Sequence, residues 1–104
     1  MNKKETVEKF IKFYKEKEML LDKTQELFGF SDGCMFYDTI FQLEDFALKV
    51  AADNIGDKSE WLDWFVYEND CGKKGYPAGY DGNTKPIKTI DDLLELIEED
   101  NKRQ

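Results

Sequence analysis

Apolar and charged residues alternate along the first eighteen residues at the spacing of an α-helix. Over residues 3–18, Val7, Phe10, Ile11 and Tyr14 fall on one stripe, while Lys and Glu side chains occupy the opposite face. Six Lys against four Glu give this segment a net charge of +2 (6 − 4). The pattern therefore predicts an amphipathic helix whose charged face lies in solvent.

A second, shorter helix is predicted over residues 19–30. Leu20, Leu21 and Leu27 lie on its apolar side. Gly29 is expected to end it, because helices commonly stop at a glycine.

The longest predicted helix covers residues 33–54, and it is apolar over well more than half of its circumference. Its main stripe at helical spacing comprises Phe36, Ile40, Leu43, Ala47, Val50 and Ala51. A helix that is apolar on so many sides is usually central, with neighbours on several faces. We therefore expect a mainly α fold in which four to five helices pack around this long helix within one domain, residues 1–104.

A fourth helix is predicted over residues 58–70, after Gly56 breaks the long helix. Asp57 and Glu60 have the spacing of a capping box, in which the Asp57 carboxylate accepts the backbone N–H of Glu60. The apolar arc of this helix is again wide, so we expect it to pack against the long helix.

Residues 71–88 differ from the rest of the chain in composition. They hold four of the seven glycines and both prolines, which is typical of consecutive turns. Asp81-Gly82 is a strong hairpin signal, so one alternative is a small β-hairpin with strands at 77–80 and 85–88. Four lysines against one aspartate make this the one clearly basic segment.

The last predicted helix begins after Thr89, which forms a variant capping box with Asp92. Ile90 and Leu93 are among the residues expected to face the core. The tail, residues 101–104, is expected to fray.

Composition narrows the classes of function. The net charge of −8 argues against binding nucleic acid through its phosphates and against an anionic membrane surface. Cys34 and Cys71 match no zinc or redox spacing, and two thiols favour a reducing compartment. With no secretory signal and no apolar run of about 20 residues, we expect a cytoplasmic protein.

The sequence offers little catalytic chemistry. It contains no histidine, which removes the commonest general base and metal ligand. Gly72-Lys73-Lys74-Gly75 lacks the spacing of a phosphate-binding loop, and the run that starts at Asp81 lacks the glycine and glutamate of a calcium loop. We therefore predict a protein that is not an enzyme and has no metal and no cofactor.

Aromatic residues near the basic segment form one unusual group. Trp61, Trp64 and Phe65 share a predicted helix face with Glu68. The favoured interpretation is structural: Glu68 and Asp70 anchor the loop by accepting from its backbone or from tyrosine hydroxyls. The alternative is a recognition surface in which the loop residues contact a partner. Its members would be Tyr76, Tyr80, Lys73 and Lys74.

The stretch from Trp61 to Glu99 contains Trp-Leu-Asp-Trp-Phe-Val-Tyr-Glu-Asn-Asp-Cys-Gly-Lys-Lys-Gly and, further on, Lys-Pro-Ile-Lys-Thr-Ile-Asp-Asp-Leu-Leu-Glu-Leu-Ile-Glu. It resembles small uncharacterised proteins of bacteriophages and mobile elements in Gram-positive bacteria. The resemblance covers roughly the C-terminal 40% of the chain. It implies a setting, that of a phage or prophage accessory protein, and it implies no mechanism.

Two functions compete on this basis. The first is an acidic, non-enzymatic accessory protein that binds another protein, in its sharper form an inhibitor of a basic host nucleic-acid enzyme such as a restriction or CRISPR nuclease. Its acidic contact residues would be Asp38, Asp45, Asp53, Asp91, Glu95 and Glu98. The alternative is a self-associating structural module, for which a large exposed apolar patch and a homodimer in solution are expected. A small enzyme that uses Glu68 and Asp70 ranks last.

Overall fold

The computed structural model describes residues 2–28, 35–76 and 85–103, and in these ranges it consists of helices and their connecting segments. The elements in chain order are α1 (Lys3–Phe28), α2 (Met35–Ile55), α3 (Trp61–Asp63), the π-helix η1 (Trp64–Glu68) and α4 (Ile90–Arg103). The mainly α class is confirmed.

Helix α1 is continuous over 26 residues, so the prediction of two helices, 3–18 and 19–30, is wrong. The helix contains neither glycine nor proline, and the Glu-Met-Leu-Leu run at 18–21 consists of strong helix formers. Asn2 caps its start, since its Oδ1 accepts a hydrogen bond of 2.8 Å from the backbone N–H of Glu5.

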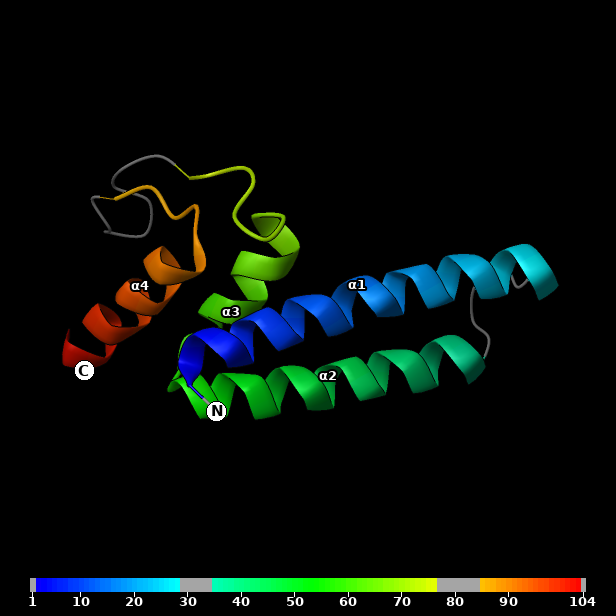
Figure 1. Ribbon diagram of the computed structural model, residues 1–104. Coiled ribbons are helices and arrows are strands. Elements are labelled where there is room, and N and C mark those ends of the chain that lie inside the picture. The colour runs from blue at the N-terminus through cyan, green and yellow to red at the C-terminus, as the bar shows by residue number, and fades with distance from the viewer. Residues whose placement is uncertain (1, 29–34, 77–84, 104) are drawn as a thin grey trace.

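Helices α1 and α2 form an antiparallel hairpin (Figure 1). Near one end Thr6 Oγ1 donates to Asn54 Oδ1 at 2.6 Å, and near the middle Lys17 Nζ donates to Glu44 Oε1 at 3.0 Å. Elements α3, η1 and α4 all lie toward the end that holds the N-terminus, while the other end of the hairpin extends away from them. The molecule is therefore elongated, with extents of 47 × 26 × 22 Å.

The hydrophobic core lies where the hairpin meets the C-terminal elements. Its buried members are Val7, Phe10, Ala51, Ile55, Leu62, Trp64, Phe65, Val66, Ile87, Leu93, Leu96 and Ile97. Only the first two come from α1 and only the next two from α2. The core is thus built mostly by residues 62–97, packed against one end of the hairpin.

Helix α2 is not central, so that prediction for residues 33–54 is wrong. It packs against α1 and α3, and the apolar stripe expected to be surrounded is partly in solvent. Ile40 and Ala51 are buried, but Leu43 and Val50 are 51% and 53% exposed. The reason is that the C-terminal elements all gather at one end and one side of the hairpin, which leaves the other apolar side of α2 uncovered.

Helix α2 ends where the sequence predicts. Gly56 has a φ of +75°, the left-handed conformation that favours glycine after a helix. The backbone N–H of Asp57 then reaches the carbonyl of Ala52 at 2.9 Å, which satisfies one of the carbonyls left free at the helix end.

The predicted helix over residues 58–70 is shorter than expected and differs in type. It begins at Trp61 and widens after three residues into η1. The Asp57 carboxylate accepts from the backbone N–H groups of Trp61 (3.1 Å) and Leu62 (2.7 Å), whereas Glu60, expected to close the capping box, has a positive φ of 62°. Asp57 therefore caps the helix across a turn, and the predicted capping box is wrong.

A buried amide holds the two described parts of the basic segment together. Asn69 is fully buried; its Oδ1 accepts from the backbone N–H of Gly75 at 3.0 Å, and its Nδ2 donates to the Ile87 carbonyl at 2.7 Å. Gly72 has a φ of +87° and lies so close to Lys88 that a Cβ atom there would be 2.0 Å from the Lys88 carbonyl oxygen. The conformation of this segment therefore depends on the side-chain amide of Asn69 and on the absence of a side chain at Gly72.

The predicted β-hairpin is not seen in the described part of the segment. Residues 85–88 are not a strand, and the other expected strand and Asp81-Gly82 lie outside the described residues. The Thr89 cap is confirmed, since Thr89 Oγ1 accepts from the Asp92 backbone N–H at 3.1 Å. Fraying from residue 101 is wrong, because α4 continues to Arg103 and Asn101 Nδ2 donates to the Gly56 carbonyl at 2.9 Å.

Candidate functional site: an apolar groove between helices α1 and α2

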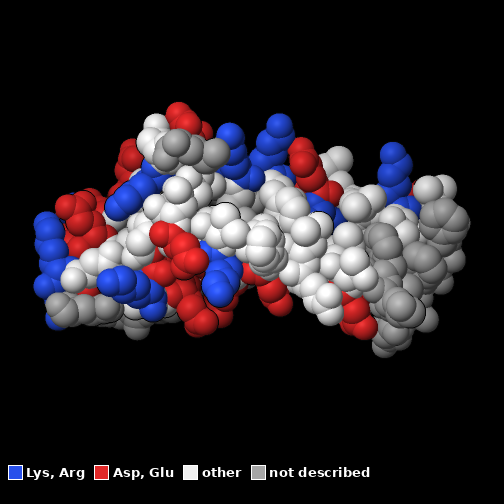
Figure 2. Space-filling view, turned by 90° about the horizontal axis from the view of Figure 1, so that it is seen from below, with Lys and Arg blue, Asp and Glu red and all other residues white. Residues whose placement is uncertain are grey.

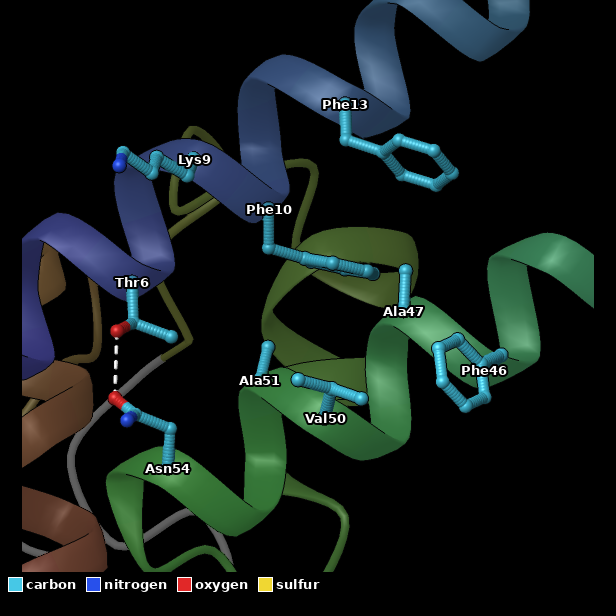
Figure 3. A pocket seen from close by; sticks show the side chains of 9 residues that line it. All are labelled: Thr6, Lys9, Phe10, Phe13, Phe46, Ala47, Val50, Ala51 and Asn54. Carbon is cyan, nitrogen blue, oxygen red and sulfur yellow. Dashed lines mark hydrogen bonds between the residues drawn. The ribbon is translucent and has the colours of Figure 1, made fainter. Parts of the chain in front are cut away.

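A groove runs between α1 and α2 on one face of the hairpin (Figure 3). Its volume near the N-terminal end is about 380 Å³, and the rings of Phe10 and Phe13 point from α1 toward Ala47 and Val50 of α2. Only Thr6, Lys9 and Asn54 contribute polar groups to this lining, which is otherwise apolar. Such a surface has the chemistry of a site for apolar side chains.

The groove continues along the hairpin past Phe13. A second hollow of about 200 Å³ shares this ring and is lined further along by Leu20 of α1 and by Ile40 and Leu43 of α2, with Glu16 and Lys17 at its edge. Leu20, Leu43 and Val50 are each about half exposed, and Phe46 is 66% exposed. The two hollows therefore form one apolar strip, which we call the α1–α2 groove.

The groove faces away from the rest of the molecule. In Figure 3 the groove residues lie in front and the chain that follows α2 passes behind them. Seen from the side of α2, the middle of the hairpin is largely uncharged, and charged side chains are densest toward the end at which the chain termini lie (Figure 2). Soluble monomers rarely leave a continuous apolar strip of this kind uncovered.

A buried polar cluster borders the groove at Lys17 and extends from there between α1, α2 and η1. Lys17 Nζ contacts the carboxylates of Glu44 at 3.0 Å and Glu18 at 2.8 Å, and it lies 4.6 Å from the centre of the Tyr14 ring. The Tyr67 hydroxyl donates to the same Glu44 carboxylate. This cluster joins α1, α2 and η1, and so fixes the spacing of the two groove walls.

The protonation of the cluster follows from its contacts. Burial of the Lys17 ammonium by itself would lower its pKa, but the hydrogen bonds to Glu18 and Glu44 prevail and the pKa is raised. Burial, reinforced by the Glu18 carboxylate, raises the pKa of Tyr14. At neutral pH the cluster is therefore a charged Lys17 held by carboxylates, with a neutral Tyr14 beside it, and this arrangement is suited to holding structure.

The six acidic residues predicted to contact a partner belong to two different helices. Asp38, Asp45 and Asp53 are exposed on α2, and Asp91, Glu95 and Glu98 are exposed on α4. Each of the α4 acids lies near a lysine, in the pairs Lys4–Asp91 (3.6 Å), Lys85–Glu95 (2.6 Å) and Lys102–Glu98 (3.5 Å). Both helices pack against α1 and α3. The α4 charges are thus partly compensated within the chain.

Of the two tryptophans grouped with the basic segment, Trp64 contacts it at Tyr76, whereas the indole of Trp61 bonds to α4. Trp64 is buried, its ring centre lies 4.9 Å from that of Tyr76, and Trp61 Nε1 donates to Asp100 at 3.2 Å. The Tyr76 hydroxyl reaches the backbone carbonyl of Glu68 at 3.4 Å.

The charged residues of this region all lie at the surface. The side chains of Glu68 and Asp70 are exposed, as are those of Lys73 and Lys74, while Tyr80 lies outside the described residues. The anchoring that was expected from the two carboxylates is provided by the Asn69 amide, which the sequence analysis did not single out.

The α1–α2 groove was also missed, although the sequence carries a signal for it. The apolar arc of α2 is wider than one neighbouring helix can cover, and we interpreted this width as burial on several sides. The same width predicts an uncovered apolar face when the neighbouring helices are short. Here α3 has three residues and η1 five, too few to cover a helix of 21 residues.

The described residues include no group of three or more His, Cys, Asp and Glu side chains placed to hold a metal ion. Among the described helices, none combines the length and the apolar character that crossing a bilayer requires. No protein-family model matches the chain, and no curated protein and no solved structure shows significant similarity to it.

Proposed function

We propose that this chain is a non-enzymatic protein-binding module that acts through the α1–α2 groove. The observation that carries the proposal is the exposure of large apolar side chains in a continuous strip, with Phe46 at 66%. Burying apolar surface is favourable by about 25 cal/mol per Å², so a strip of this kind favours association with another apolar surface. The groove has few polar groups, which is the composition of an interface core.

A pull-down with matched variants tests the proposal. The tagged wild type, Phe46→Lys and Met19→Lys are incubated with bacterial host lysate, and the bound proteins, including untagged copies of the chain, are quantified by mass spectrometry. Met19 is 69% exposed on α1 but lies outside the groove lining, so its variant adds the same charge elsewhere.

We expect Met19→Lys to retain the wild-type partner and Phe46→Lys to lose at least about tenfold, because a buried ammonium in an apolar interface costs more than about 1.4 kcal/mol. Equal recovery with all three baits would contradict a role for the groove. Circular dichroism and thermal melting confirm that both variants are folded.

The acidic-inhibitor hypothesis stays a second prediction, favoured by the three exposed aspartates of α2. It is distinguished in the same experiment by its salt dependence. A basic nucleic-acid enzyme that is captured at low salt, lost at high salt and indifferent to Phe46→Lys would support it over the groove.

A further inference from the structure

The hollow near the N-terminal end of the α1–α2 groove is flanked by charges of opposite sign on its two helices. On the α1 side Lys9 lines the hollow, and on the α2 side Asp53 lies next to the lining residue Asn54; both are exposed. Among the described residues, neither takes part in an ion pair. The acidic Glu16 lies at the edge of the second hollow, further along α1. The flanks of the first hollow are therefore available to a partner that carries acid where α1 is basic and base where α2 is acidic.

A second copy of the same chain satisfies this requirement. If two hairpins stack groove to groove, with a two-fold axis parallel to the helices, α1 of each copy lies over α2 of the other in antiparallel orientation. The rotation keeps every residue at its own level along the hairpin. Basic and acidic flanks then meet on both sides of the stack.

The register of the hairpin decides which charges meet. The Thr6–Asn54 and Lys17–Glu44 contacts show which residues of α1 and α2 lie at one level. By the same register Lys9 is level with the region of Asp53. The stacked arrangement thus brings Lys9 of each copy near Asp53 of the other copy.

The size of the strip suits such a pairing. From Thr6 to Leu20 it runs about 20 Å along α1, at about 1.5 Å per residue, and it is two helices wide, so its area is on the order of 400 Å². With a charged rim of similar area, the interface approaches the roughly 800 Å² per partner of a standard complex. Leu20, Leu43, Phe46 and Val50 are each about half exposed or more, so the described residues leave this strip in solvent.

From the proposed function, on which this inference rests, together with the charges and the register, we infer that the occupant of the groove is a second copy of this chain. The product is an isologous homodimer with a four-helix bundle at its centre. Each copy contributes its apolar strip and both flanks. The single interface of the dimer contains the Lys9–Asp53 contact twice, once on each side of the two-fold axis.

Charge-swapped variants test the inference. Lys9→Asp and Asp53→Lys each place like charges opposite one another in their own homodimers. A mixture of the two restores both contacts, since Asp at position 9 of one copy then meets Lys at position 53 of the other. A pair formed within one chain would not be restored by mixing.

The dissociation constant is measured by sedimentation velocity over a dilution series of the purified full chain. We expect a reversible wild-type dimer, roughly tenfold weaker association for each variant alone, and recovery to within about twofold of the wild type in the mixture. Glu8→Lys serves as the control, because it lies next to Lys9 in sequence but is turned about 100° away from the groove, and it should leave the dimer unchanged.

A purified wild type that stays monomeric at all concentrations, or a mixture no tighter than its components, overturns the inference. The proposed function is separable from it. A monomer whose captured partner protein is still lost with Phe46→Lys and kept with Met19→Lys retains a protein-binding groove with a different occupant, whereas a monomer with no such difference loses both.

Discussion

Two faces of the α1–α2 hairpin use the same residue types in opposite ways. On the face that meets α3 and α4, Phe65 is fully buried among residues from all parts of the chain. On the groove face, Phe46 is 66% exposed, although it belongs to α2, which is rich in apolar residues. The difference shows that apolar content predicts the need for a neighbour and does not say whether the neighbour belongs to the same chain.

Polar groups follow the same division. Among the C-terminal elements, the Asn69 side chain is fully buried; its oxygen accepts one hydrogen bond and its nitrogen donates another. On the groove side, Asn54 is exposed and bonded once, by Thr6. Buried, fully bonded polar groups and uncovered apolar surface thus lie on different sides of one small molecule.

The largest expected effect comes from truncating one phenylalanine in each region. Phe65→Ala should lower the free energy of unfolding by about 3 to 5 kcal/mol, because it leaves a cavity in a closely packed core. Phe46→Ala should change the stability of the isolated protein by less than about 0.5 kcal/mol, since the side chain is mostly in solvent. Urea denaturation under dilute conditions, where the chain is monomeric, measures both.

Similar losses for the two substitutions would contradict the division. Such a result would mean that the Phe46 side chain is already buried in the isolated protein. A dependence of the Phe46→Ala effect on protein concentration would instead report its role in association.

A smaller effect is expected from the two asparagines. Asn69→Ala should cost about 2 kcal/mol, because it leaves the buried N–H of Gly75 and the carbonyl of Ile87 without their partner. Asn54→Ala should cost about 0.5 kcal/mol, since water can replace the exposed amide. Amide hydrogen exchange at Gly75 provides the readout: protection there should fall in the first variant and persist in the second.

The smallest effect is a pH dependence. Burial alone would raise the pKa of Asp92, but hydrogen bonds from the backbone N–H groups of Lys88 and Thr89 prevail and lower it. A carboxyl whose folded pKa is lowered stabilises the protein above its ordinary pKa, near 3.8, and this contribution disappears as the pH falls through the folded value.

The wild type should therefore be more stable than Asp92→Asn at pH 6, and the two should converge toward about pH 2 to 3. A constant difference between wild type and Asp92→Asn across this range would argue against the cap as the cause.

Local signals predicted the helical class and several helix ends. Gly56 ends α2 and Thr89 caps α4 because each acts through bonds to its near neighbours in sequence. Predictions that needed distant partners were less successful. The division of residues 3–30 failed because hydrophobic pattern alone does not break a helix that lacks glycine and proline. The role of Asn69 was missed because its partners lie six and eighteen residues away.

By itself, the sequence determined the helical class, the end of α2 at Gly56, the cap of α4 at Thr89 and which helix faces are apolar, since these depend on contacts within a few residues. Only the tertiary structure decided which apolar faces are covered. Elements α3, η1 and α4 pack against one end and one side of the hairpin, and the groove face stays uncovered by the described residues. The groove exists because coverage depends on the arrangement of the whole chain, whereas amphipathicity depends on each helix alone.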